Sequence, residues 1–358
     1  MEGLKHFLNT LTDPAIFLTI AVALFLAVLR WYRFVTQPRI AGAVGALMLA
    51  LLLFGATDEN LVRNALGKPD NIPIPLMLFS VGFFTWLALR KAAVNDERAE
   101  KGLPPEETDE ANQKVYTWPD LVYSEFICLL LVSALLLVWA LYLKAPLEPP
   151  ASPTKTTNPA KAPWYFLALQ EMLVYFDPWL AGVVLPGLII AGLMAIPYID
   201  PNPRGNGYYT FVERKFAVTM FLFGFLILWV VLILYGAFLR GPNWNFFGPF
   251  ERWDAHKVVA LTNVDLSEYF WIRWLGKPLP ERWWIREAPG IMLLGGYFLA
   301  IPPLLAYTRL RGLYARLGFV RYNILMNLLL FMALLPIKMV LRWTVNLKYL
   351  IAIKNYNV

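Results

Sequence analysis

The sequence predicts an all-α fold, a polytopic transmembrane helix bundle of about 8 transmembrane helices with further helices along the outer membrane face. Composition carries this prediction: 58% of the 358 residues are hydrophobic and only 16% are charged, against about a quarter in soluble domains. The sparse charges leave long apolar stretches, and about 20 apolar residues cross a bilayer as a helix. Because lipid cannot satisfy backbone polar groups, these stretches must form internally hydrogen-bonded structure.

Eight intervals between charged residues have the composition of membrane spans. They cover residues 14–29, 40–57, 71–89, 126–143, 178–199, 216–239, 288–308 and 322–337. The first and the last are short, but each can extend past a flanking charge, Arg30 or Lys338, whose long side chain reaches the interface. No cleavable leader pattern is evident, so we expect the first span to be retained.

Arginines in two short loops set the predicted orientation. The loops between the first and second spans and between the seventh and eighth hold only basic charges: Arg30, Arg33, Arg39, Arg309, Arg311, Arg316 and Arg321. Short loops rich in Lys and Arg stay on the inner side of the membrane. Both chain termini are therefore predicted outside.

Composition also predicts four regions. A three-helix membrane region, 1–95, precedes a charged, aromatic-poor linker, 96–117, which is predicted to be cytoplasmic. Five further spans follow. We divide them into a region covering 118–310, whose bounds rest on the family resemblance of its motifs given below, and an extra transmembrane helix with its tail, 311–358.

Two long connections are predicted at the outer membrane face. Segment 144–177 opens with prolines and then becomes a helical patch, from about Pro159 to Phe176, that is too polar to span. Segment 240–287 is crowded with aromatic side chains, as in interfacial helices or a docking surface. Its His256 could serve as a ligand or a proton relay, although a lone histidine there is more often a surface residue.

The cysteine and histidine counts exclude several chemistries. Cys128, the one cysteine, lies in an apolar run and permits no disulfide, zinc cluster or c-haem attachment motif. His6 and His256 lie far apart and outside the spans, so the chain cannot hold b haem between its own helices, and no metal site is predicted. The net charge of +7 fits juxtamembrane Lys and Arg better than a nucleic-acid partner.

The segment from Asn158 to Glu171 is the most informative for function. Proline followed by aromatic residues is typical of an interfacial helix. Glu171 follows Trp164 by seven positions, so on a helix the two side chains share a face, two turns apart. A carboxylate beside aromatic rings at the membrane edge is suited to accept a proton from a hydroquinone.

Three short motifs resemble the C-terminal half of cytochrome b and subunit IV of cytochrome b6f complexes. Pro-Trp-Tyr-Phe at 163–166 is similar to the Pro-Glu-Trp-Tyr of the family's quinol-oxidation site. Trp-Pro-Asp-Leu at 118–121 resembles the Trp-Pro-Asn-Asp that opens the first helix of subunit IV. A glycine- and proline-bearing span ends in Pro-Tyr-Ile-Asp-Pro at 197–201, and another span starts after Arg214 and Lys215, as in the family's next two helices.

The resemblance implies a quinol-oxidation site outside, on the side predicted for the Pro-Trp-Tyr loop. Its expected walls are Pro163, Trp164, Tyr165, Phe166 and Gln170. Aligned on Trp-Tyr, the family glutamate falls on Pro163, so this chain departs from the pattern at the carboxylate. Glu171 is our candidate for the proton-accepting, catalytic group, and the alternative is a carboxylate that caps or pairs with a neighbouring subunit.

On the inner side, the resemblance implies a second quinone site that takes up protons. Asp120 is the candidate for handling protons, Arg214 is its charge partner, and Lys215, which follows Arg214, is a further candidate for this site. Basic residues at span ends are also common topology anchors, and that interpretation stays open.

The implied function is shared with partner subunits. We expect the non-haem, subunit IV-like membrane subunit of a cytochrome bc/b6f-type quinol oxidoreductase, supplying an outer quinol-oxidation site and a proton path without being catalytic alone. Quinol or quinone is the expected small molecule. The b haems are expected on a cytochrome b6-like partner and a 2Fe–2S centre on a Rieske protein. A c-type cytochrome, a dimeric complex and a bacterial inner or plasma-type membrane complete the expectation.

Other functions stay open. The chain could be a quinone-binding membrane anchor of another respiratory oxidoreductase, paired with a molybdenum or iron–sulfur subunit. It could be a membrane transporter, a class that places ionisable residues in mid-membrane. A pure assembly scaffold is a third possibility, because a degenerate site would also lack the family glutamate.

Overall fold

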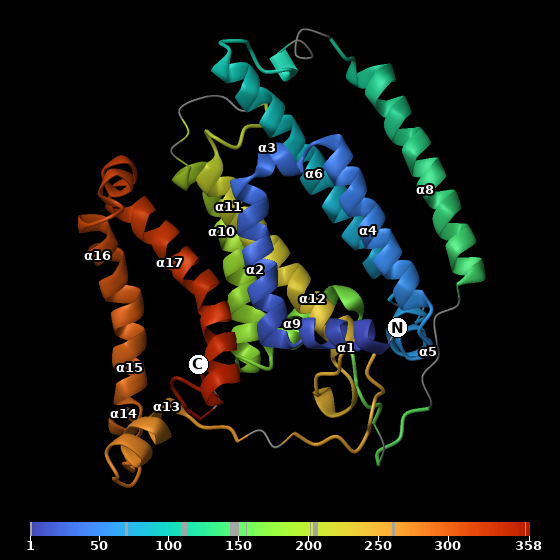
Figure 1. The fold of residues 1–358 in the computed structure, drawn as a ribbon. Coiled ribbons are helices and arrows are strands. Elements are labelled where there is room, and N and C mark those ends of the chain that lie inside the picture. Colours follow the sequence, from blue (N-terminus) through green and yellow to red (C-terminus); the bar gives the residue numbers. More distant parts are fainter. Residues whose placement is uncertain are drawn as a thin grey trace. The chain divides into compact units, whose positions relative to one another are not determined.

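Long apolar helices make up most of the fold (Figure 1). The computed structural model describes residues 2–68, 71–108, 114–143, 150–154, 156–200, 202, 207–259, 262–354 and 356–358. Within these ranges, 7 runs are long and apolar enough to cross a membrane: Pro38–Ala56, Pro73–Glu100, Thr117–Tyr142, Leu180–Ile199, Lys215–Leu239, Ala288–Tyr307 and Arg311–Val345. Helices α1 (Glu2–Leu11) and α2 (Pro14–Arg30), bent by 78°, raise the number to 8 if the pair is one span. The predicted all-α, polytopic fold is confirmed.

Several spans contain more than one helical piece. The α-helices of the spans are α4 (Pro38–Ala56), α6 (Pro73–Glu100), α8 (Val122–Tyr142), α10 (Leu185–Ile199), α11 (Lys215–Leu222), α12 (Val231–Leu234), α15 (Ala288–Gly295), α16 (Ile301–Tyr307) and α17 (Arg311–Val345). The π-helical turns that precede or join them are Thr117–Leu121, Leu180–Val184, Phe223–Val230, Tyr235–Leu239 and Gly296–Ala300. Outside the spans, the shorter pieces are α3 (Tyr32–Val35), α5 (Glu59–Leu61), Val62–Leu66, Trp164–Phe166, α9 (Leu167–Met172), Pro242–Trp244, α13 (Leu266–Glu268), Tyr269–Trp274 and α14 (Trp283–Arg286).

Two helices are longer than the apolar intervals predicted from the sequence. Helix α6 continues to Glu100, so the first part of the charged segment is helical. Helix α17 covers 35 residues with a kink at Gly318, where φ is +73°, and the predicted span 322–337 lies in the longer piece after the kink. A charged residue limits the part of a helix that lipid can cover, but backbone hydrogen bonding continues beyond it.

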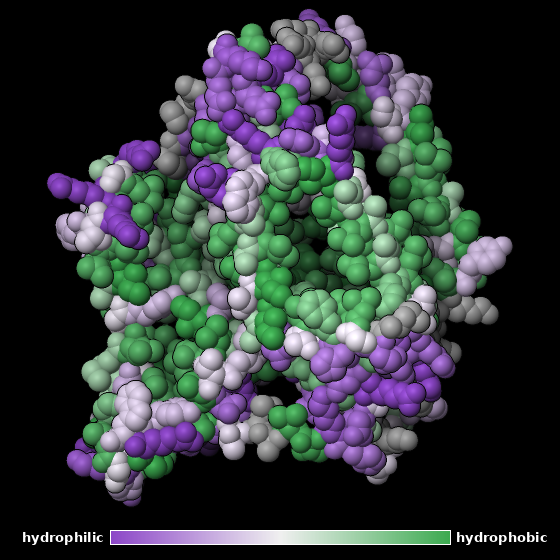
Figure 2. Space-filling model, in the orientation of Figure 1, coloured by the Kyte–Doolittle hydropathy of each residue, from purple (hydrophilic) through white to green (hydrophobic). Residues whose placement is uncertain are grey.

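The chain forms two compact units. Unit 1 comprises residues 1–164, 206–223 and 237–254, and unit 2 comprises residues 165–205, 224–236 and 255–358. Figure 2 shows hydrophobic residues over α2, α4 and α8 of unit 1, with hydrophilic residues gathered beyond the ends of α4. The four regions expected from composition remain a prediction.

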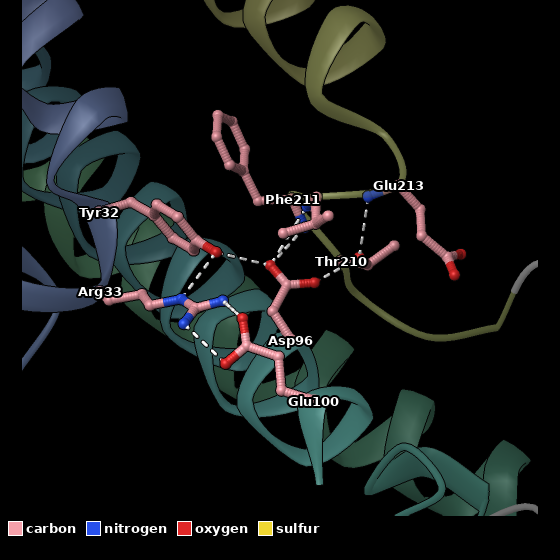
Figure 3. Close-up of polar contacts among 8 residues, drawn as sticks. Tyr32, Arg33, Asp96, Glu100, Thr210, Phe211 and Glu213 are labelled. Atoms are coloured by element: carbon pink, nitrogen blue, oxygen red, sulfur yellow. Dashed lines mark hydrogen bonds and ion pairs between the residues drawn. The ribbon is translucent and has the colours of Figure 1, made fainter. Parts of the chain in front are cut away.

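A buried carboxylate fastens three parts of unit 1 together (Figure 3). Asp96, on α6, accepts hydrogen bonds from the Tyr32 hydroxyl at 2.8 Å and from the Thr210 hydroxyl at 2.6 Å. The backbone N–H groups of Phe211 and Val212 donate to the same carboxylate at 3.1 and 3.2 Å. Helix α3, helix α6 and the loop before α11 are thereby held at one point.

We predict that Asp96→Ala destabilises unit 1 strongly. The change leaves four donors without their acceptor, and an unsatisfied buried polar group costs about 1–3 kcal/mol. The thermal unfolding midpoint of the detergent-purified protein measures the effect. Glu100→Ala is the matched control, because Glu100 lies one turn later on α6 and pairs with Arg33 at the surface, at 2.6 Å. Equal losses in the two variants would contradict the anchoring role of Asp96.

The C-terminal tail of unit 2 is tied to the segment around α13. The N–H of Lys348 donates to the Val264 carbonyl at 2.9 Å, and the N–H of Leu266 donates to the Tyr349 carbonyl at 2.9 Å. Farther along, the Ala352 N–H donates to the buried Glu287 carboxylate at 3.0 Å. The tail is therefore an ordered part of unit 2 that is held by backbone hydrogen bonds.

Candidate functional site

The segment that carries the Pro-Trp-Tyr motif contains a shorter helix than the sequence predicted. Residues 164–166 form a 3₁₀ turn, and α9 covers only Leu167–Met172. The expected helix from about Pro159 to Phe176 is wrong at both ends. Pro159 and Pro163 lack an N–H and bias their preceding residues away from helical angles, so the helix begins only after them.

Glu171 lies on the buried face of α9. Its side chain is 0% exposed, and Leu167, Ala168 and Met172 are also buried. The Tyr175 hydroxyl, one turn later, donates a hydrogen bond to Glu171 Oε1 at 3.3 Å. A buried carboxylate needs such donors, because removal from water is costly without them. Glu171 is thus a buried, hydrogen-bonded side chain, and its role as a proton acceptor remains a prediction.

Close packing of α9 in unit 2 explains this burial. Helix α12 packs against α9, and a Cβ added at Gly236 would lie 3.2 Å from Leu167 Cβ. Tyr235, the neighbouring residue, is fully buried as well. Glycine at 236 leaves room for the Leu167 side chain, which lies on the same face of α9 as Glu171, so this face is covered by protein.

The aromatic residues of the motif lie differently from Glu171. Tyr165 is 51% exposed and Phe166 is 50% exposed, and their ring centroids are 4.8 Å apart. Pro163 is exposed, whereas Trp164 and Gln170 are half-buried. Because Trp164 belongs to a 3₁₀ turn, the α-helical spacing to Glu171 does not apply at its position. The common role of these wall residues and Glu171 in a quinol site remains a prediction.

Unit 1 anchors the stretch before the motif through residues that sequence reasoning missed. The side-chain amide of Asn158 donates to Asn243 Oδ1 at 2.9 Å, and the Asn243 N–H donates back to Asn158 Oδ1 at 2.7 Å. Lys161 donates to the Ala237 carbonyl at 3.0 Å and lies over the Trp253 ring, 5.2 Å from its centroid. These partners are about 80 positions away in the sequence, where no periodic signal could connect them.

The most important omission is the polar end of α17. Lys338 is 0% exposed and donates to the Lys348 carbonyl at 2.6 Å, so it does not reach toward the interface as expected. Arg342, one turn later, is buried and donates to Asn263 Oδ1 at 2.6 Å. The spacing of four residues was the available signal, because it puts both cations on one helix face.

The inner-side candidates all lie in unit 1. Asp120 is exposed in the turn Thr117–Leu121, and its carbonyl accepts a hydrogen bond from the Ser124 hydroxyl. Arg214 is half-buried just before α11, and Lys215 is the exposed first residue of that helix. The Asp96 cluster holds the loop that precedes them. A shared quinone or proton site of Asp120 and Arg214 remains a prediction.

The histidines do not fit a haem-ligand pair. His6 is exposed on α1 in unit 1, and His256 is exposed in unit 2. Within the described ranges, no three His, Cys, Asp or Glu side chains gather closely enough to hold a metal ion.

The segment with Glu171 and the Pro-Trp-Tyr motif matches a known family. Residues 150–244 match the model described as cytochrome b(C-terminal)/b6/petD. This segment is similar to the C-terminal part of cytochrome b. The resemblance seen in the motifs is thereby confirmed for the cytochrome b segment, residues 150–244. The 118–121 motif and the last helix lie outside it.

A relative extends this likeness. The menaquinol:cytochrome c reductase cytochrome c subunit of Geobacillus thermodenitrificans is 34% identical to the chain over 96 residues, covering 24% of this chain and 37% of that protein. The chain thus spans 37% of the length of that curated relative. No solved structure matches the chain. The comparisons support a cytochrome b segment inside a larger membrane protein with further helices of its own.

Proposed function

We propose that this chain is the non-haem, subunit IV-like membrane subunit of a cytochrome bc-type quinol oxidoreductase. One observation carries the proposal: the cytochrome b segment holds the Pro-Trp-Tyr motif and, one helical piece later, the fully buried Glu171. The relative in a menaquinol:cytochrome c reductase supports the same class of complex.

The proposed chemistry is proton acceptance during quinol oxidation on the outer side. Oxidation of a quinol releases two protons and two electrons. Glu171 accepts one proton from a quinol hydroxyl, and the Tyr175 hydrogen bond stabilises the ionised carboxylate before transfer. Tyr165 and Phe166 offer exposed rings for the quinol head group. The b haem and the 2Fe–2S centre that would take the electrons belong, in this proposal, to a cytochrome b6-like partner and a Rieske partner.

A buried ionisable residue in a membrane helix favours transport as a second candidate function. Lys338 is such a residue, since it is fully buried within α17. It lies near the end of the helix, however, and donates to a carbonyl of the tail. This placement fits a structural or proton-handling cation better than a midpoint of a transport pathway.

Purification through a tag on this chain tests the proposal. In mild detergent we expect reducible b haem, a cytochrome b6-like subunit and a Rieske protein to co-purify. A haem-free preparation with a molybdenum or iron–sulfur subunit would instead assign the chain to another oxidoreductase as its anchor. A chain that purifies alone, without redox partners, would favour transport.

Helix α8 is the expected contact with such a partner. No side chain of α8, whose residues are all described, is buried. The helix carries the only cysteine of the sequence, Cys128, which is exposed.

We predict that Cys128 reacts with a membrane-permeant maleimide in the isolated subunit and is protected at least about tenfold in the assembled complex. Protection follows because a partner helix excludes the reagent from the thiol. Mass spectrometry of the labelled chain measures the rates. A cysteine introduced at Thr344, exposed on α17, is the control site. Equal labelling of Cys128 in both states would place the partner elsewhere.

A further inference from the structure

The last helix and its tail surround the segment that follows Glu171 in unit 2. Trp343 of α17 contacts Tyr175 edge-on, with ring centroids 6.2 Å apart. The Lys338 ammonium lies 5.8 Å from the centroid of the Phe176 ring. The tail also contacts Asp177, the residue after Phe176, because the Tyr349 hydroxyl donates to Asp177 Oδ1 at 3.2 Å. All of these last-helix and tail residues lie outside the cytochrome b segment.

Arg342, on α17 next to Trp343, interacts electrostatically with two tyrosines of unit 2. Its charge interacts with the hydroxyls of Tyr175 and Tyr349, while its N–H groups donate to Asn263 Oδ1 and to the Asn346 carbonyl. Among the described residues, no carboxylate lies within ion-pair distance of this guanidinium. Its positive charge acts on the two phenols as well as on Lys338 and Lys348, and it favours negative charge on either phenol oxygen.

Each phenol is paired with a carboxylate. Tyr175 donates to the fully buried Glu171, and Tyr349 donates to Asp177, which is half-buried next to the exposed Pro178. Burial and the negative charge of Asp177 raise the pKa of Tyr349, so this phenol keeps its proton near neutral pH. Exposure to solvent thus increases from the Glu171 pair to the Asp177 pair.

Other charges also face this cluster. Lys338 and Lys348 contribute positive charge, and Asp265 contributes negative charge beside the Tyr349 N–H. Burial raises the pKa of Asp265 and lowers the pKa of Lys348. Because both signs are present in similar number, a proton can cross the cluster without leaving a large net charge behind.

We propose that Tyr175, Arg342, Tyr349 and Asp177 form the route by which the proton accepted by Glu171 leaves toward the outer aqueous phase. Tyr349 passes its proton to Asp177, which releases it to water. The route requires a bridging water through which Tyr175 refills Tyr349, and protonated Glu171 refills Tyr175. Every group ends in its starting state. Arg342 is a positioning residue that stabilises the transient negative charge on either phenol. The route rests on the proposed function, which makes Glu171 the first acceptor.

Four variants of the assembled complex test the route. Tyr349→Phe removes the phenol hydroxyl next to Asp177, and Arg342→Gln removes the positive charge of the route. Tyr269→Phe and Arg286→Gln are matched controls, because Tyr269 donates to the Val345 carbonyl at the end of the same helix and Arg286 donates to the Ala352 carbonyl of the same tail. Oxidation of a short-chain menaquinol analogue is measured from pH 5 to pH 9 in H₂O and D₂O, with co-purification of the subunits as the assembly check.

We expect both route variants to lower kcat at least about tenfold, to leave KM for the quinol within twofold, and to increase the solvent isotope effect. Arg342→Gln should also move the acid limb of the pH profile upward, and Arg342→Lys should restore part of the rate. The two controls should stay within twofold of the unchanged protein. Tyr349→Phe is the decisive variant if Arg342→Gln fails to assemble.

Unchanged kcat and isotope effects in Tyr349→Phe, with slow turnover in Glu171→Gln, would overturn the route and leave the proposed function standing. Unchanged turnover in Glu171→Gln would overturn Glu171 as the first acceptor and the route with it. A kcat loss in the controls equal to that in the route variants would show a structural role of the tail and would also reject the route.

Discussion

Glu171→Gln is expected to slow quinol oxidation about 100-fold or more while the subunit stays in the complex. Glutamine has the same shape and keeps an oxygen that accepts the Tyr175 hydrogen bond, so the packing of α9 is preserved. It cannot accept a proton, however, and a positioned general base contributes about 10²–10⁴-fold to a rate. Initial rates of quinol oxidation in membranes, measured across pH, give the effect.

Two further substitutions make this result interpretable. Glu171→Asp retains a carboxylate and should recover part of the rate. Met172→Leu changes a buried neighbour on the same helix with little change of volume, so its rate should stay near that of the unchanged protein. Unchanged turnover of Glu171→Gln at every pH would remove Glu171 from the mechanism.

Gly290→Ala is expected to detach the C-terminal tail from unit 2. A Cβ at Gly290 would lie 1.9 Å from the Leu350 carbonyl oxygen and 2.9 Å from Ile351 Cγ1. Backbone cannot move aside as a side-chain end does, so the tail must shift, at a cost of about 1–3 kcal/mol or more. Trypsin cleavage after Lys348 and Lys354, followed by mass spectrometry, measures the release, and we expect it to be at least about tenfold faster.

Gly295→Ala is the matched control. It lies on the same helix, α15, and a Cβ there meets nothing within 4 Å. Alanine also favours a helix over glycine, by about 1 kcal/mol. The control should therefore cleave at the unchanged rate. Equal protection of the tail in both variants would show that it does not pack against Gly290.

The fold could be predicted from the sequence because the transfer of long apolar stretches into lipid dominates it. Apolar intervals of bilayer length leave the chain little choice but to form spanning helices, and each predicted interval coincides with an apolar helix. Helix ends were less predictable. Helices α6 and α17 continue through charged residues, because a charge ends contact with lipid without ending backbone hydrogen bonding.

The site was only partly predictable. The Pro-Trp-Tyr motif and Glu171 form a local pattern, so the sequence alone could single them out. The only sequence signal for Tyr175 was its spacing of one helical turn from Glu171. Arg342 and Tyr349 contribute from more than 160 positions away, where pairing depends on tertiary packing. Lys338 was interpreted as reaching the interface, because a sequence does not show which face of a terminal turn the tail covers.

The Asp96 cluster also sets an order of assembly during synthesis. Its carboxylate lies 114 residues before the Thr210 hydroxyl that completes its set of donors. Until the ribosome has produced the loop at 210–212, α6 carries a carboxylate that can reach only part of its partners and must stay in contact with water. The contacts that fasten α3 and α6 at Asp96 are therefore complete only after the chain has been made beyond the cytochrome b motif. A chain released before residue 207 should be a target for membrane proteases.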